Sequence, residues 1–259
     1  MRRTKRRPHR AIERDVLWTL LRNGIEPTQP GIGSTQSGGG RLKCPIKEGT
    51  ITVDGFRYKY TCYVDQNTYV FNGGTGRPCF VLHTYPNSTD GVLADFIRSG
   101  KCSIDPGATT KHAGRAAFAL AKELGVQELR LTDNSSKHIS PTKSFVVSDM
   151  EFLSMGKTWY ESFLPIVPEP SAQVYIEEAR VRVHQNTWDD VFTCLTRRFP
   201  TIEIPVAVDD IDTSAPGSAM IVFQRLKDAK TSFFAEYRWG LPQCNGFDSL
   251  HGSSWIAHL

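Results

Sequence analysis

The stretch GRAAFALAKELGVQELRL, residues 114–131, is the part of the chain whose structure follows most directly from its residues. Ala, Leu and Glu fill Gly114–Leu124, and Gly125 stands where the C-cap glycine of a helix is expected. The next run, Val126–Leu131, follows this glycine directly and is predicted to form a strand. A helix, a turn and a strand in this order predict an α/β fold.

Upstream of this stretch, short β-rich runs alternate with Gly, Asn and Pro. The predicted strands are Thr50–Val53, Phe56–Val64, Thr68–Phe71 and Cys79–Thr84. Short consecutive strands with tight turns predict an antiparallel meander. A short helix is predicted at Val92–Ser99.

Downstream, Ser148–Phe163 is predicted to form one helix, with Ser148 as the N-cap and Glu151 completing a capping box. After a proline-rich break at 165–170, the predictions are a strand at Gln173–Val183, helices at Trp188–Phe199 and Ala219–Tyr237, and loop with a short strand around Trp255 in Gly240–Leu259. We therefore expect an α/β half at 41–164 and a second α/β section at 165–259 packed on it. The sheet is expected to be mixed or antiparallel, with helices packed against it.

The first ten residues carry positive charge that the rest of the chain does not share. The formal net charge is +4, and without the six basic residues of this arm it would be about −2. The run predicts a disordered arm, residues 1–10, that contacts nucleic-acid phosphates or acts as a nuclear import signal. A solvated tail is the alternative. The basic residues are Arg2, Arg3, Lys5, Arg6, Arg7 and Arg10.

Two further segments separate this arm from the folded body. Residues 11–22 place five apolar side chains at helical spacing, which predicts an amphipathic docking helix. The Gly- and Ser-rich run GIGSTQSGGG at 31–40 predicts a flexible linker, which extends over 23–40. The folded body is expected to start near Arg41.

The six cysteines contain no CxxC pair, and the histidines show no metal-ligand spacing, so no metal site is expected. Four of the cysteines lie between positions 44 and 102, which would allow one or two disulfides in an oxidising compartment. Buried free thiols are the prediction. No apolar run approaches the length of a membrane span, and none of signal-peptide type follows the basic start.

Polar residues follow the predicted strand that ends near Leu131. Asp133, Asn134 and Ser135 stand where α/β proteins often place functional loops, so they could bind phosphate or serve in acid–base chemistry. A turn held by local side-chain hydrogen bonds is the alternative. The acidic cluster Asp209, Asp210 and Asp212 could bind a cation, but a solvated loop is expected.

Three runs resemble a widespread, largely uncharacterised group of proteins from large nucleocytoplasmic DNA viruses: LRLTDNSSK (129–137), FLSMGKTWYESF (152–163) and LHGSSWIAHL (250–259). The resemblance covers roughly residues 50–259. It implies viral origin and no particular activity. Expected partners are nucleic acid or other virion proteins, and expected locations are the host nucleus, the host cytoplasm or the virion.

A second resemblance has chemical content. The run KHAGRA (111–116), followed by a helix, a strand and Trp159-Tyr160-Glu161, is similar to the core of the GNAT acyltransferases. In that family, a loop Arg/Gln-x-x-Gly-x-Gly/Ala opens a helix whose free N–H groups hold the coenzyme A pyrophosphate. The resemblance implies Tyr160 as general acid, and its implied acetyl-CoA-binding residues are Lys111, Gly114, Arg115 and Ala116. The chain departs from the family in having Lys at 111 and no long strand running directly into the loop, and an alanine-rich packing helix is the alternative.

Three functions remain open at this stage. The first is a non-catalytic viral protein, virion-associated or close to nucleic acid, without a cofactor. The second is an acyl-CoA-dependent N-acyltransferase, and the third is a sequence-independent nucleic-acid-binding protein. The sequence favours the first, because packing explains each catalytic motif equally well.

Overall fold

The structure is a computed structural model that describes residues 47–63, 68–72, 78–85, 88–94 and 104–259. Three predicted segments lie outside the described residues: the basic arm 1–10, the docking helix 11–22 and the linker 23–40.

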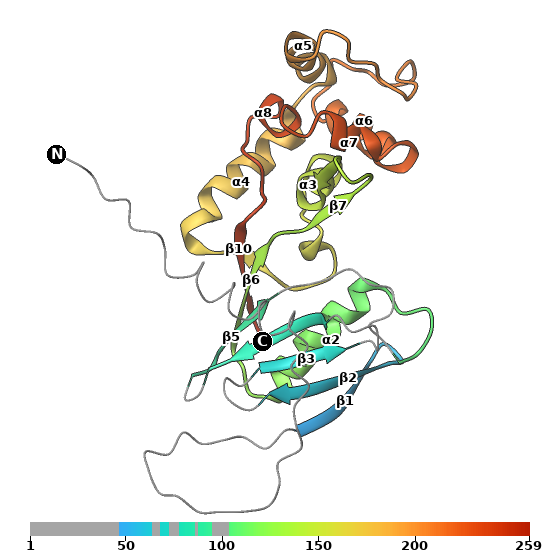
Figure 1. Cartoon of the computed structure of the whole chain (residues 1–259). Coiled ribbons are helices and arrows are strands. Elements are labelled where there is room, and N and C mark those ends of the chain that lie inside the picture. The colour runs from blue at the N-terminus through green and yellow to red at the C-terminus, as the bar shows by residue number, and fades with distance from the viewer. Residues whose placement is uncertain (1–46, 64–67, 73–77, 86–87, 95–103) are drawn as a thin grey trace, which may run out of the picture. The chain divides into compact units, whose positions relative to one another are not determined.

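Eight strands form one sheet in the order β1-β2-β3-β4-β5-β6-β10-β9 (Figure 1). Neighbouring strands are antiparallel except β5 and β6, which run parallel. This confirms the predicted mixed sheet. The strands are β1 (Lys47–Val53), β2 (Phe56–Tyr63), β3 (Thr68–Asn72), β4 (Pro78–Thr84), β5 (Asp90–Ala94), β6 (Glu128–Asp133), β9 (Val167–Pro168) and β10 (Ser253–His258).

The first four strands form the predicted meander. Asp54 and Gly55 join β1 to β2 with positive φ angles of 53° and 82°, a backbone that an Asp-Gly hairpin turn favours. Phe71 and Phe80 stack across β3 and β4, with ring centroids 3.8 Å apart. The helix predicted at Val92–Ser99 is wrong over its described part, because residues 90–94 form β5 and pair with both β4 and β6.

Helix α2 (Thr110–Glu123) connects β5 to β6 and packs against the sheet (Figure 1). It confirms the predicted helix but begins four residues earlier. Thr109 caps it: the Thr109 hydroxyl accepts from the His112 N–H, and His112 Nδ1 accepts from the Thr109 N–H. Gly125, with φ of 78°, follows its end as predicted.

Helix α3 (Val147–Met155) is shorter than the helix predicted at Ser148–Phe163. The predicted capping box is wrong, because Val146 is the N-cap and Ser148 is buried in the first turn. Gly156 ends α3 with a left-handed φ of 66°, and a separate short 3₁₀ helix, η1 (Tyr160–Ser162), follows.

Helix α4 (Pro170–Gln185) replaces the strand predicted at Gln173–Val183. Pro170 suits the first turn of a helix, and the buried residues Ile176, Ala179 and Val183 recur at helical spacing. This tertiary burial outweighs the β-propensity of the individual Val, Tyr and Ile residues.

The remaining predictions for the C-terminal section are mostly confirmed. Helix α5 and strand β10 lie where they were predicted, but the helix predicted at Ala219–Tyr237 is two helices, α6 and α7, separated at Lys230. Strand β10 lies between β6 and β9 in the sheet. The other elements are β7 (Ser136–His138), β8 (Ser144–Val146), α5 (Trp188–Arg198), α6 (Ser218–Ala229), α7 (Ser232–Glu236) and α8 (Leu241–Cys244).

One disulfide joins Cys194 of α5 to Cys244 of α8, with Cα atoms 5.6 Å apart. The prediction of free thiols is therefore wrong for this pair. The two bonded cysteines are far apart in sequence and meet only because α8 folds back onto α5. Within the described parts of the chain, no helix is long and apolar enough to cross a membrane, and no group of His, Cys, Asp and Glu could hold a metal ion.

Candidate functional site

The first candidate site lies where β6 ends. Asp133 is fully buried, and its Oδ1 accepts from the Ser135 N–H at 2.9 Å. Its Oδ2 and the buried hydroxyls of Ser135 and Ser148 have no hydrogen-bond partner of normal geometry among the described residues. Burial raises the pKa of the Asp133 carboxyl, although the nearby serines and the charge of His251 oppose this shift.

A second buried carboxyl, Asp149, projects from the first turn of α3. Its two oxygens accept from the Ser249 hydroxyl at 2.6 Å and from the Leu250 N–H at 2.7 Å. Burial, with a smaller repulsion from Asp133, raises the pKa of Asp149 to about 6. A carboxyl with this pKa can exchange a proton near neutral pH.

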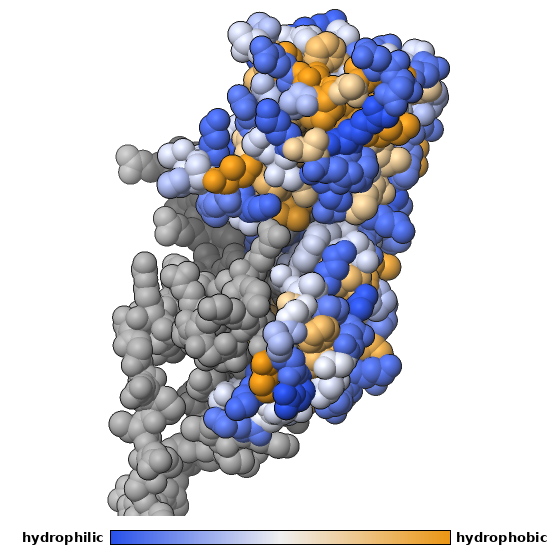
Figure 2. Space-filling view, turned by 90° about the vertical axis from the view of Figure 1, so that its right-hand side faces the viewer, coloured by the Kyte–Doolittle hydropathy of each residue, from blue (hydrophilic) through white to orange (hydrophobic). Residues whose placement is uncertain are grey.

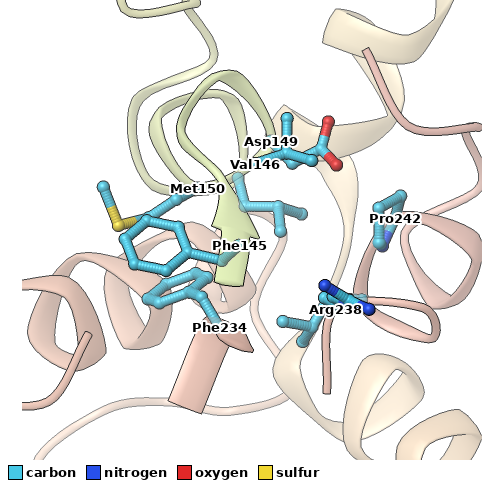
Figure 3. Close-up of a pocket in the computed structure, with 9 residues that line it drawn as sticks. Phe145, Val146, Asp149, Met150, Phe234, Arg238 and Pro242 are labelled. Carbon is cyan, nitrogen blue, oxygen red and sulfur yellow. The ribbon is translucent and has the colours of Figure 1, made fainter. Parts of the chain in front are cut away.

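The space beside Asp149 is small. The adjoining cavity has a volume of about 10 Å³, which is room for about one water molecule. Figure 3 shows the Phe145 and Phe234 rings together on one side of it, with Arg238 and Pro242 on the other. The cavity therefore leaves no room for a substrate beside Asp149.

The Asp149 carboxyl and the Asp133 backbone also hold the chain together. Asp149 binds the backbone at Leu250, while the Gly252 N–H donates to the carbonyl oxygen of Asp133 at 2.6 Å. Both contacts fasten the segment that leads into β10 against β6 and α3. The predicted loop Asp133, Asn134 and Ser135 is thus observed as a turn bonded to its own backbone, with a buried carboxyl at its base.

The residues of the acyltransferase resemblance lie near this end of β6 as well. Lys111 Nζ lies 5.8 Å from the centroid of the Phe163 ring, and the Tyr160 and Phe163 centroids are 6.1 Å apart. The start of α2 is therefore close to η1. Tyr160 is buried, with 5% of its surface exposed, and burial raises its pKa, so its proton is held more firmly than in water.

The other residues of that resemblance are used by the fold. Gly114 is the fifth residue of α2 and is buried, so its N–H belongs to the helix and not to an open loop. Arg115 pairs with Asp54, with Nη1 and Oδ2 2.8 Å apart, and Ala116 is fully buried in the core. The fold thus uses all three of these positions in its own contacts.

The second candidate site is a groove between α5 and the irregular segment that connects α5 to α6. It has a volume of about 490 Å³ and is open to solvent. Trp188 and Phe192 stack on its α5 side, with centroids 5.8 Å apart and planes 19° from parallel. We call it the α5 groove; it is lined by Trp188, Asp189, Phe192, Ile204, Val206, Ala207, Val208, Asp209 and Thr213.

The acidic residues near the α5 groove divide into two kinds. Asp210 pairs with Arg225 at 2.6 Å, which lowers the pKa of Asp210 to about 2, and Asp212 accepts from the Ser214 hydroxyl at 2.7 Å. Asp189 and Asp209 are exposed at the groove, and their carboxylates have no ion-pair or hydrogen-bond partner in the described chain. Of the predicted acidic cluster, Asp210 and Asp212 are thus bonded within the fold, and only Asp209 is available to a partner.

Sequence reasoning missed the α5 groove. The signal that could have found it is the alternation in TIEIPVAV, residues 201–208, an extended pattern without a predicted strand. Figure 2 shows hydrophobic residues between hydrophilic ones at the upper end of the molecule, where Figure 1 places α5 and α6.

No known family model, curated protein or solved structure matches this chain.

Proposed function

We propose that the chain is a non-catalytic protein of a large nucleocytoplasmic DNA virus, and that it binds a segment of another virion protein in the α5 groove. The viral part of the proposal rests on the three runs at 129–137, 152–163 and 250–259. The observation that carries the binding role is the open groove of about 490 Å³ with apolar and aromatic walls.

Burial at the groove explains why a partner would be stabilised there. Phe192, Ile204, Val206 and Val208 are each only partly buried, so each still exposes apolar surface that a partner can cover. Covering apolar surface contributes about 25 cal/mol per Å² before the costs of association. Phe192, whose ring stacks on that of the buried Trp188, is the aromatic side chain of the groove that a partner can contact.

The test is a selection of binders from a random peptide library displayed on phage. Peptides selected on the full-length protein should lose binding to Val206→Glu, which places a charge in the groove. They should keep binding to Thr201→Glu, an exposed position in the same segment that does not line the groove. Failure to enrich any peptide, or equal binding to all three proteins, would reject the proposal.

One observation favours a second candidate, the acyl-CoA-dependent N-acyltransferase. Residues 90–94, where a helix was predicted, form the strand β5, so α2 connects two parallel neighbouring strands, β5 and β6. Lys111 of α2 also lies near Phe163, whose ring is close to that of Tyr160. Calorimetric titration with acetyl-CoA and with CoA tests it. Micromolar binding that is lost in Lys111→Ala supports this candidate, whereas no heat from the wild type rejects it.

The third function, sequence-independent nucleic-acid binding, finds less support in the folded body, where many basic side chains are already paired. The pairs are Arg57–Asp105, Arg115–Asp54, Arg130–Glu128, Arg180–Glu161, Arg182–Glu178, Arg225–Asp210 and Lys227–Glu151. We therefore propose that the arm, residues 1–10, makes any phosphate contacts. Deletion of the arm should abolish salt-dependent DNA binding, and binding that survives the deletion would place it on the body.

A further inference from the structure

The hairpin of β7 and β8 carries a pair of residues that occurs once in the chain. Of the 15 prolines, only Pro141 directly follows a serine or threonine, and that residue is Ser140. Lys143 stands three positions after Ser140, so the run is Ser-Pro-Thr-Lys. Proline-directed serine kinases phosphorylate a serine that precedes proline, and several of them favour a basic residue three positions after it. The chain therefore matches the substrate pattern of such a kinase at a single place.

This substrate pattern has a physical reason. Proline lacks a backbone N–H, so it suits a kinase pocket that offers no acceptor at that position, where any other residue would bury an unpaired donor. A lysine three positions after the serine can pair with an anionic group of the kinase. Both features belong to the segment alone, and the fold decides whether a kinase can reach it.

The fold places the run Ser-Pro-Thr-Lys at an exposed turn. The strands β7 and β8 pair antiparallel as a sheet of two strands beside α3 (Figure 1). The turn between them, residues 139–143, is exposed except at Ser140, which is half-buried, and none of residues 137–144 is buried. Proteases prefer exposed loop tips because such tips can enter an active site, and the same reason holds for a kinase.

Few interactions hold this turn closed. The Ile139 N–H donates to the Lys143 carbonyl oxygen at 2.8 Å, and the Lys143 N–H donates to the Ser140 hydroxyl oxygen at 3.1 Å. A two-stranded sheet with strands of 3 residues is marginally stable by itself. Phe145, the buried residue of β8, lies outside the turn and packs on Phe234, with ring centroids 6.3 Å apart. The turn can therefore open into the extended form that a kinase binds while Phe145 stays buried.

The charge around Ser140 suits a phosphate group. Residues 135–148 contain no Asp, Glu or Arg, and their two lysines, Lys137 and Lys143, give the segment a formal charge of +2. A phosphoserine adds a charge of about −1.5 to −2. The added phosphate would stand among cations, to which it can make charge-assisted hydrogen bonds, and would meet no like charge within the hairpin.

We infer that Ser140 is a phosphorylation site for a proline-directed serine kinase that uses ATP. In the transfer, a bond forms between Ser140 Oγ and the γ-phosphorus of ATP. The bond from that phosphorus to the oxygen that bridges to the β-phosphate breaks, ADP leaves, and the hydroxyl proton passes to the catalytic aspartate of the kinase. The hairpin contributes no residue to the α5 groove, so the site is independent of the proposed binding role.

The test incubates the full-length protein with ATP and a purified cyclin-dependent kinase. Intact mass measures phosphoryl incorporation, and peptide mapping locates it. We expect a single phosphoryl group on each chain, at Ser140, and no incorporation into Ser140→Ala. The matched control is Thr142→Ala, which removes the other hydroxyl of the turn and should keep the incorporation.

The variant Pro141→Ala separates recognition by the kinase from access to the turn. It keeps the acceptor serine but restores a backbone N–H after it, so the initial rate should fall at least about tenfold. Loss of the proline also loosens the turn, because proline restricts the open chain. A rate that depended on access alone would therefore rise. Unfolding curves in urea show that each variant is folded.

A synthetic peptide of residues 135–146 distinguishes the ways in which the inference can be wrong. If the kinase phosphorylates the peptide but not the folded protein, the fold hides Ser140. If it phosphorylates neither, or if Pro141→Ala reacts at the wild-type rate, the kinase does not recognise the Ser-Pro pair. Each of these results overturns the inference, as does incorporation only at other residues.

Discussion

The disulfide between Cys194 and Cys244 closes a loop with a sequence separation of 50 residues, which contains all of α6 and α7 and the segment 201–208 of the α5 groove. Opening it in the variant Cys194→Ser/Cys244→Ser frees this loop in the unfolded chain. The chain-entropy relation for a loop of this length gives about 4 kcal/mol of lost stability at 25 °C. The reason is that the linkage restricts the unfolded ensemble far more than the folded one.

Urea unfolding followed by tryptophan fluorescence measures this effect. The double variant should unfold at a midpoint lower by more than about 1 M, because the denaturant slope of a chain this size is a few kcal/mol per M. A reductant should lower the wild-type midpoint in the same direction and leave the double variant unchanged, which is the internal control. Equal midpoints for the two proteins without reductant would refute the loop-closure reasoning.

Three further predictions concern single side chains. Burial raises the pKa of Asp149 from 3.8 to about 6, so the contribution of Asp149 to the free energy of unfolding is fully present below pH 3.8. This contribution, about 3 kcal/mol, is lost as the pH rises through 6. Asp149→Asn should flatten this pH dependence when unfolding is measured across the range. Gly156→Ala should lower the melting temperature more than Gly125→Ala, because both have positive φ but only at Gly156 does the added methyl meet a histidine ring. Arg180→Met should cost about 2 kcal/mol in urea unfolding, because the largely buried Glu161 carboxylate loses its charged partner and keeps the Thr158 N–H; adding Glu161→Gln should recover part of the loss, and no recovery would contradict the pairing.

Local signals predicted those elements whose caps, turns and periodicity agree with their tertiary burial. The helix before Gly125, the strand after it and the hairpin at Asp54-Gly55 each combine a suitable turn residue with a matching apolar period. The errors fall where local preference and burial disagree. Val92 and Leu93 belong to a segment that pairs with strands on both sides, so this segment is the strand β5 and not the predicted helix. Pro170 begins the helix α4, although several of the residues in α4 favour strands.

The candidate sites divide in the same way. The polar residues at Asp133–Ser135 could be located from the sequence, because a polar run after a strand marks a turn at the sheet edge. Their burial could not, since it depends on residues 249–252 covering them from more than a hundred positions away. The α5 groove was not predicted for a related reason: it forms only where α5 and residues 201–208 meet, and neither segment indicates a groove when it is considered alone.

The sequence by itself determined the α/β class, the helix α2, the strand β6 and the concentration of positive charge in residues 1–10. These features depend on local composition, helix caps and the period of apolar residues. Only the tertiary structure decided which cysteines pair, which carboxyls are buried and where apolar surface remains open. Those properties arise from contacts between segments distant in sequence, whose free energies of burial and pairing outweigh local propensities of a few tenths of a kcal/mol per residue.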